Sequence, residues 1–141
     1  MHRFLTGEYM SAYSGFAPLV LRVATGAVFA MHGYQKFSGG LEGVTGFLTS
    51  LGFPIPAVFA VILIAVELVG GIALILGLAT RPVAKLAAIV AFVGFLTVHV
   101  SNGFFISANG YEFIMLLFAA SVSLMITGPG KWALDDYFRK Q

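Results

Sequence analysis

The chain has 141 residues, of which 59% are hydrophobic and only 10% charged, and its mean hydropathy is +0.95. Soluble domains carry roughly 25% charged residues, so this composition excludes an ordinary soluble protein and indicates one membrane domain without a separate soluble catalytic domain. The net charge of +2 comes from scattered Lys and Arg residues, which argues against nucleic acid as a partner, and the lack of cysteine excludes thiol relays and cysteine-ligated metal clusters.

Four apolar runs predict four transmembrane helices, at about residues 16–37, 54–78, 82–100 and 111–127. Prolines stand near the start of the first three runs, and Gly128, Pro129 and Gly130 end the fourth. The runs lack the two-residue alternation of a membrane barrel. The predicted fold is therefore an all-α membrane protein, a four-transmembrane-helix bundle that forms a single domain over residues 1–141.

The segments outside these runs carry two weaker patterns. Val44, Phe47, Leu48 and Leu51 are spaced i, i+3, i+4, i+7, which predicts a short amphipathic helix in the first outer loop. The tail at 129–141 mixes aromatic and charged residues, as an interfacial anchor does. Both segments are expected to lie at the membrane surface.

Lys and Arg residues are distributed unequally between the two sides of the predicted bundle. Only Lys36 borders the outer side, and the other side holds Arg3, Arg81, Lys85, Lys131, Arg139 and Lys140. The positive-inside rule then predicts that both termini and the turn at 79–82 are cytoplasmic. We expect a multi-pass protein of the plasma (inner) membrane, with loops 38–53 and 101–110 facing outward.

Two ionisable residues lie inside the first and second predicted helices. Arg22 and Glu67 are expected about 9 Å and 16 Å from the inner ends of their helices, at a rise of 1.5 Å per residue. They predict one of three arrangements: an ion pair between the helices, an Arg22 that reaches the inner headgroups while Glu67 is protonated, or a proton relay through Glu67. Gly70 and Gly71 favour close approach of a neighbouring helix, so Glu67 is expected to point into the bundle.

A second polar group lies near the outer ends of three helices, where His32, His99 and Glu112 reach a similar depth. These residues predict one of three structures. The first is a latch in which the histidines donate to Glu112 or to loop carbonyls. The second is a ligand site, for example for a quinone headgroup, with Gln35, Asn102 and Tyr111 as further polar groups. The third is a divalent metal held by His32, His99 and Glu112, or a haem held by the two histidines.

Five stretches together resemble the DoxX family over about residues 18–137. They are LRVATGAVFAMHGYQKFSGG (21–40), GFLTSLGFPIPAVFAVILIAVELVGGIALILGLATRPVA (46–84), LTVHVSNGFF (96–105), GYEF (110–113) and GPGKWALD (128–135). The resemblance implies a four-helix integral membrane protein. It also implies a role similar to the membrane subunits of a thiosulfate:quinone oxidoreductase, or to membrane complexes linked to oxidative stress.

Three functions follow from these patterns. The first is a small membrane subunit of a quinone-linked redox or oxidative-stress system, at most an oxidoreductase subunit, with quinone as the cofactor and a redox protein as partner. The second is a noncatalytic membrane scaffold or assembly partner. The third is proton-coupled transport through Glu67 and Arg22, which requires a homo-oligomer because one small bundle has little lumen.

Overall fold

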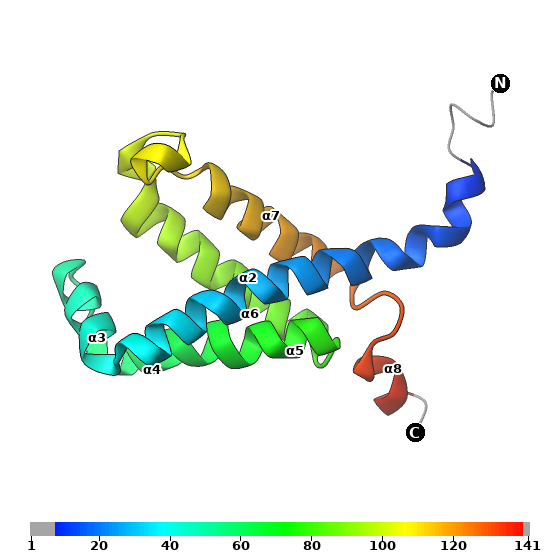
Figure 1. The fold of residues 1–141 in the computed structure, drawn as a ribbon, viewed down its shortest axis with the longest axis horizontal. Coiled ribbons are helices and arrows are strands. Elements are labelled where there is room, and N and C mark those ends of the chain that lie inside the picture. The colour runs from blue at the N-terminus through cyan, green and yellow to red at the C-terminus, as the bar shows by residue number, and fades with distance from the viewer. Residues whose placement is uncertain (1–7, 140–141) are drawn as a thin grey trace.

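The computed structural model describes residues 8–139, and over this range the chain is helical without strands (Figure 1). A 3-10 segment, η1, precedes the first long helix. The elements in chain order are η1 (Glu8–Phe16), α2 (Ala17–Gly39), α3 (Leu41–Ser50), α4 (Pro56–Ala65), η2 (Val66–Gly70), α5 (Gly71–Leu76), α6 (Thr80–Gly94), η3 (Phe95–His99), η4 (Val100–Asn102), η5 (Ile106–Ala108), α7 (Glu112–Thr127) and α8 (Leu134–Phe138).

The four predicted apolar runs are all helical. Three of the described segments are long and apolar enough to cross a membrane, namely Met10–Gly39, Pro56–Leu76 and Thr80–Asn102. The fourth run is α7, an apolar helix of 16 residues. The all-α membrane architecture is thus confirmed, while the count of four crossings and the orientation of the termini stay predictions.

The helices pack as two pairs that meet along the centre of the molecule. In Figure 1, α2 runs along α4 and α5, and α6 pairs with α7. The core between the pairs consists of Phe29, Leu74 and Leu124 with three alanines of α6, Ala84, Ala87 and Ala91. Small side chains on α6 let the neighbouring helices approach closely, as is usual where helices pack inside a membrane.

Glycines bring α2 against the second helical segment backbone to backbone. A Cβ added at Gly33 would lie 2.3 Å from the Leu68 nitrogen, and one at Gly71 would lie 2.4 Å from the Ala30 nitrogen. The close approach predicted for Gly71 is therefore present. At Gly70 an added Cβ would meet only the Val83 side chain, at 3.3 Å, so this glycine contributes less.

Arg22 fastens the tail to the end of the bundle where α5 and α7 end, and we call this the tail end. The side chain is 1% exposed and donates to five carbonyl oxygens, those of Leu74, Ile75, Pro129, Lys131 and Trp132. The structure thus places Arg22 with backbone carbonyls and not in the predicted ion pair with Glu67. The physical reason is local, since carbonyls at the end of α5 and in the loop after α7 lie beyond the last helical N–H groups, although the Leu74 carbonyl also accepts the Gly77 N–H.

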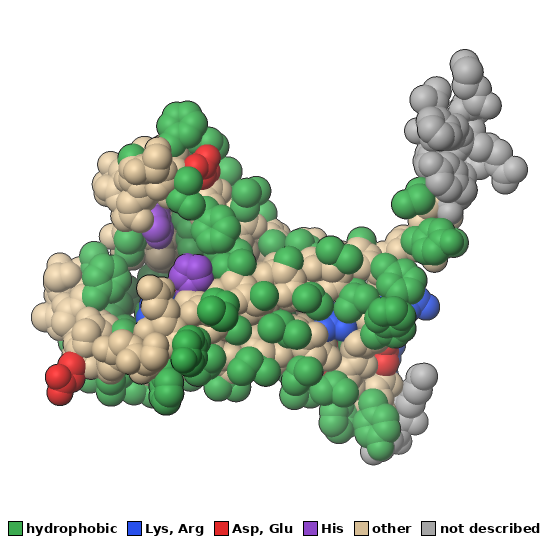
Figure 2. Space-filling model, in the orientation of Figure 1, with side chains coloured by type: hydrophobic (Ala, Val, Ile, Leu, Met, Phe, Trp, Pro, Cys, Tyr) green, Lys and Arg blue, Asp and Glu red, His purple; other side chains and the backbone are tan. Residues whose placement is uncertain are grey.

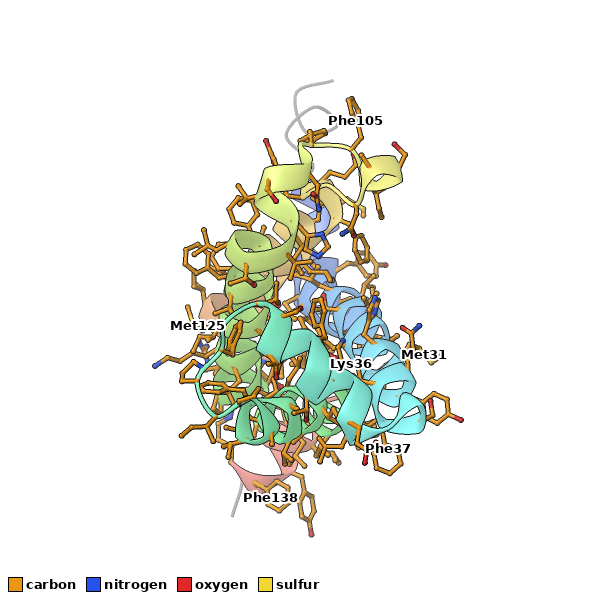
Figure 3. All side chains as sticks on the ribbon, turned by 90° about the vertical axis from the view of Figure 1, so that its left-hand side faces the viewer. Met31, Lys36, Phe37, Phe105, Met125 and Phe138 are labelled. Carbon is orange, nitrogen blue, oxygen red and sulfur yellow. The ribbon has the colours of Figure 1, made fainter. Side chains whose placement is uncertain are left out.

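The opposite end, which we call the α3 end, carries the helix predicted in the first outer loop. Val44 and Leu48 of α3 are buried and pack with Ala60 of α4, together with Leu51 and Phe53. Figure 2 shows hydrophobic side chains over most of the visible face, with the histidines near the α3 end. Figure 3 shows Met31 and Phe37 projecting outward from α2. Among the cations that set the predicted orientation, Arg3 and Lys140 lie outside the described residues.

Candidate functional site

A cavity of about 500 Å³ lies toward the α3 end of the bundle. Its walls come from α2, α4, α6 and α7, and side chains of α3 close one side of it. Most of the lining is apolar, including the aromatic rings of Phe29, Phe47, Phe59 and Phe113. A space of this size and character falls within the range of small-molecule sites, roughly 300–1,000 Å³.

Four ionisable side chains interrupt this apolar lining: His32, Lys36, Glu67 and His99. Two of them lie in π-helical turns, Glu67 in η2 and His99 in η3. A π turn fits one more residue than an α turn and redirects the side chains that it carries, and such turns recur at functional sites. Both irregular turns of the long helices thus present a titratable group to the same cavity.

Lys36 and Glu67 form an ion pair on the cavity wall. Lys36 Nζ lies 2.6 Å from Glu67 Oε2, and the two side chains are 26% and 9% exposed. The pair follows from the packing described above, because Gly33 seats α2 directly on the backbone of Glu67 and Leu68 and Lys36 lies one turn further along α2. Glu67 points into the bundle as predicted.

The pairing of Lys36 with Glu67 was not predicted, because the sequence places Lys36 at the outer boundary and Arg22, the expected partner of Glu67, toward the inner end. One signal could have found it. Lys36 lies on the same side of the first helix as His32, and glycines mark where the second helix crosses. The relative shift of the two helices decides the partner, and that shift depends on Gly33.

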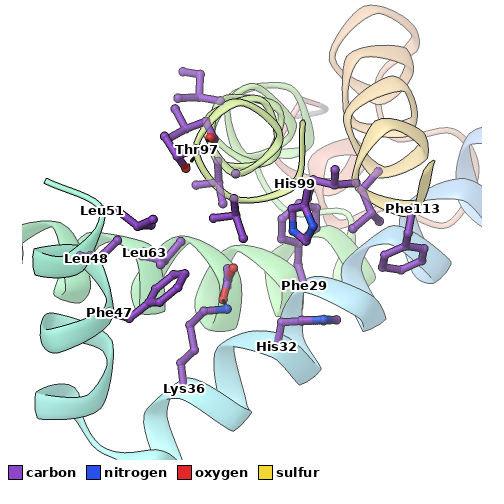
Figure 4. A pocket seen from close by; sticks show the side chains of 18 of the residues that line it. Phe29, His32, Lys36, Phe47, Leu48, Leu51, Leu63, Thr97, His99 and Phe113 are labelled. Atoms are coloured by element: carbon purple, nitrogen blue, oxygen red, sulfur yellow. Dashed lines mark hydrogen bonds and ion pairs between the residues drawn. The ribbon is translucent and has the colours of Figure 1, made fainter. Parts of the chain in front are cut away.

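His32 and His99 both line the cavity and use the same ring nitrogen in the same way. His32 Nδ1 lies 2.8 Å from the carbonyl oxygen of Val28, one turn earlier in α2. His99 Nδ1 lies 2.9 Å from the carbonyl oxygen of Asn109. In Figure 4 the two imidazoles lie on the same side of the cavity as Phe113, with Phe47 and Leu48 on the other side.

The remaining predicted site residues, Gln35, Asn102, Tyr111 and Glu112, are not among the residues that line this cavity. Three of them shape the turn at 103–112. Asn102 donates to the carbonyls of Val98 and Asn109, and Glu112 Oε1 accepts the backbone N–H of Ile106 at 2.6 Å. The Tyr111 ring packs edge-on against Phe95 and Phe104. Gln35 is exposed on α2.

The predicted polar latch is present in part, and the predicted metal trio is not assembled. His99 donates to a loop carbonyl, as a latch requires, but Glu112 bonds to the backbone of Ile106. Within residues 8–139, no three His, Asp or Glu side chains come close enough together to hold a metal ion. The reason is that the first turn of α7 directs Glu112 back over the loop.

Comparison with known proteins identifies one family and several relatives of this chain. The model of the DoxX family matches residues 17–100. The chain is 39% identical over 122 residues to "Putative oxidoreductase CatD" of Bacillus subtilis, covering 86% of this chain and 87% of that protein. It is 30% identical over 125 residues to "Inner membrane protein YphA" of Escherichia coli, covering 83% and 86% of the two chains.

A third relative is "Uncharacterized membrane protein Rv3486" of Mycobacterium tuberculosis, which is 29% identical over 136 residues and covers 87% and 82% of the two chains. No solved structure matches this chain. The family match covers more than half of the chain and includes α2 to η3, which carry all four ionisable groups of the cavity. The chain therefore belongs to the DoxX family of membrane proteins.

Proposed function

We propose that this protein is a small membrane subunit of a quinone-linked redox system, and that the cavity binds the ring of a quinone or quinol. The observation that carries the proposal is the cavity itself, an apolar space that holds His32, Lys36, Glu67 and His99. Ring headgroups need an apolar slot with a few hydrogen-bonding groups, and Phe29, Phe47 and Phe113 supply aromatic walls. The name of the CatD relative describes that protein as a candidate oxidoreductase, which agrees with a redox role.

The proposed subunit works with a redox protein as partner. Reduction of a quinone takes two electrons, and a chain without cysteine has no dithiol to supply them, so in this proposal they come from another protein. The turn between η4 and η5 offers a contact surface, because Phe104 and Phe105 are 45% and 68% exposed there. Exposed aromatic side chains are enriched at protein interfaces.

Quinone analysis of the purified protein tests the ligand directly, and Gly94 offers a matched pair of variants. Gly94 lines the cavity, and a Cβ added there would meet only Ile114 Cδ1, at 3.9 Å. Gly94→Ala should therefore be accommodated, whereas the ring of Gly94→Phe would occupy the cavity. We expect bound lipid quinone in the wild type and in Gly94→Ala, and its loss in a folded Gly94→Phe. Equal quinone in all three proteins, or none in the wild type, would refute the proposal.

The exposed pair Phe104 and Phe105 also favours a second candidate, a noncatalytic membrane scaffold. A scaffold needs its partner surface and not the cavity. Phe104→Ala with Phe105→Ala should then abolish a stable complex or homo-oligomer isolated in gentle detergent, while Gly94→Phe leaves that complex intact. Recovery of a monomer alone from the wild type counts against the scaffold.

A further inference from the structure

The hydrogen bonds of the two cavity histidines determine which ring nitrogen carries the proton. Each Nδ1 faces a backbone carbonyl, that of Val28 for His32 and that of Asn109 for His99. A carbonyl oxygen can only accept, so Nδ1 must be the donor in both rings. In the neutral imidazole the second nitrogen, Nε2, is then an acceptor without a proton.

Among the other polar groups that line the cavity, the Asn109 carboxamide can donate and accept, so it binds a carbonyl and a hydroxyl alike. Lys36 and Glu67 bond to each other, and the Thr97 hydroxyl donates to the Val93 carbonyl at 2.8 Å. Lys36 keeps further N–H groups, which can donate to a carbonyl oxygen and to a phenolic oxygen alike. Lys36 therefore does not distinguish an oxidised ring from a reduced one, and the two Nε2 atoms do.

We propose that the cavity selects the reduced, dihydroxy form of its aromatic ligand. This inference rests on the proposed function and deepens it. A quinone carries two carbonyl acceptors, which the Nε2 acceptors of neutral His32 and His99 cannot satisfy. A hydroquinone carries O–H donors, and a hydroxyl that lies against the side of the cavity formed by His32 and His99 can donate to an Nε2 atom. Burial of an unsatisfied polar group is costly, so the mismatch penalises the quinone.

The preference has a redox consequence for the bound ligand. With one or two matched hydrogen bonds at stake, the hydroquinone should bind about tenfold more tightly than the quinone. Tighter binding of the reduced form raises the reduction potential of the bound couple. For this two-electron couple a tenfold preference corresponds to about 30 mV. The site would thus favour retention of the product of quinone reduction.

The test is equilibrium binding under argon of three probes to the full-length protein in nanodiscs. The probes are 2,3-dimethyl-1,4-naphthoquinone, its hydroquinone, and the dimethyl ether of that hydroquinone. We expect the hydroquinone to bind about tenfold more tightly than the other two. In His32→Phe and His99→Phe, which keep a ring but remove the acceptor, the ratio of hydroquinone to quinone affinity should fall toward one.

The remaining outcomes separate the selection of the reduced form from the proposed quinone site itself. Equal or tighter binding of the quinone, or a dimethyl ether that binds as well as the hydroquinone, overturns the selection of the reduced form. In that case the proposal of a quinone site still holds if Gly94→Phe abolishes the binding of the quinone. Absence of binding by all three probes overturns both. The ether comparison needs only the wild-type protein, so the test holds even where a histidine variant does not fold.

Discussion

At the scale of single residues, the ion pair of Lys36 and Glu67 is the contact that links the cavity to the packing of the bundle. The Glu67 side chain is 9% exposed and its partner nitrogen is 2.6 Å away. Removing one partner of such a pair leaves the other charge buried without compensation, which is more destabilising than removing both. The pair should therefore show strong energetic coupling.

We predict that Lys36→Met lowers the free energy of unfolding by about 2 kcal/mol, a value below that for fully buried pairs because Lys36 is partly exposed. Glu67→Gln should cost less, because the charge that it leaves unpaired, Lys36, is the more exposed of the two. The double variant should be more stable than the sum of the single losses indicates. Unfolding in detergent followed by circular dichroism measures all four proteins. Strictly additive losses would show that the pair does not couple.

Arg22 is the second residue whose side chain carries a specific prediction. Its planar guanidinium serves carbonyls at the end of α5 and in the tail at the same time, and a lysine ammonium cannot match that geometry. Arg22→Lys should cost at least about 2 kcal/mol, because buried carbonyls lose their donors.

Arg81 provides the matched control for this substitution. Arg81 donates to carbonyls at the end of α7, but these hydrogen bonds are exposed to the surroundings. Arg81→Lys should therefore have a smaller effect on the melting temperature, and the tail should become sensitive to protease only in Arg22→Lys. Equal effects of the two substitutions would contradict the role of Arg22 as a buried clamp.

The residue scale also shows what the sequence could and could not predict. That His32 and His99 come to the same part of the bundle was predictable, because each lies near the end of a long apolar run. The partner of Glu67 was not, since it depends on how far α2 is shifted against η2. The direction of Glu112 was also unpredictable, because the turn at 103–112 closes through its bond to Ile106.

At the scale of elements, the contact between α2 and η2 is set by Gly33. A methyl group at this position would overlap the backbone of Glu67 and Leu68, and backbone cannot move aside as a flexible side chain can. Separation of the two helices would also pull Lys36 from Glu67. The contact between α2 and η2 and the ion pair on the cavity wall therefore both depend on Gly33.

We predict that Gly33→Ala destabilises the protein by about 1–3 kcal/mol through overpacking. Gly43→Ala in α3 is the control, because nothing lies within 4 Å of an added Cβ there. Alanine favours helix over glycine by about 0.5–1 kcal/mol, so the control should be neutral or slightly stabilised. The melting temperatures of the two variants, measured in the same detergent, test this difference in stability. A tolerated Gly33→Ala would contradict the backbone contact between α2 and η2.

The helices themselves were predictable from hydropathy and proline positions, and the π turns were not. Neither VELVG nor FLTVH contains a proline, and Gly70 at the end of VELVG is equally compatible with a regular helix. A π turn changes which carbonyl each N–H reaches and leaves the residue pattern unchanged. One additional residue rotates the rest of the helix by about 100°. A prediction that assumes an ideal α-helix therefore assigns the side chains after the π turn to the wrong face. This explains why Asn102, in η4 directly after η3, does not line the cavity together with His99.

At the scale of the whole molecule, the distribution of charge predicts how the bundle sits in the membrane. Arg81, Lys131 and Arg139 lie in or beside the segments at the tail end, and Lys36 contributes to the cavity instead of the α3 surface. From these charges the positive-inside rule predicts a cytoplasmic tail end and an α3 on the outer side.

Because the chain has no cysteine, single added cysteines report this orientation. A cysteine at Glu42, on α3, should react with a membrane-impermeant maleimide in intact cells. Cysteines added to the N-terminus and to the C-terminus should both react only after lysis, since the four predicted crossings put the two ends on one side. Opposite behaviour of the two ends would show an odd number of crossings.

The central claim at this scale is that a lipid-soluble ring enters the cavity between α2, η2 and η3. Photolabelling of the membrane-embedded protein with an azidoquinone, followed by peptide mapping, tests it most directly. We predict adducts within residues 28–36 and 93–99, suppressed by excess unlabelled quinone and absent in Gly94→Phe. Adducts confined to the outward-facing side chains of α4, or insensitive to competitor, would contradict the claim.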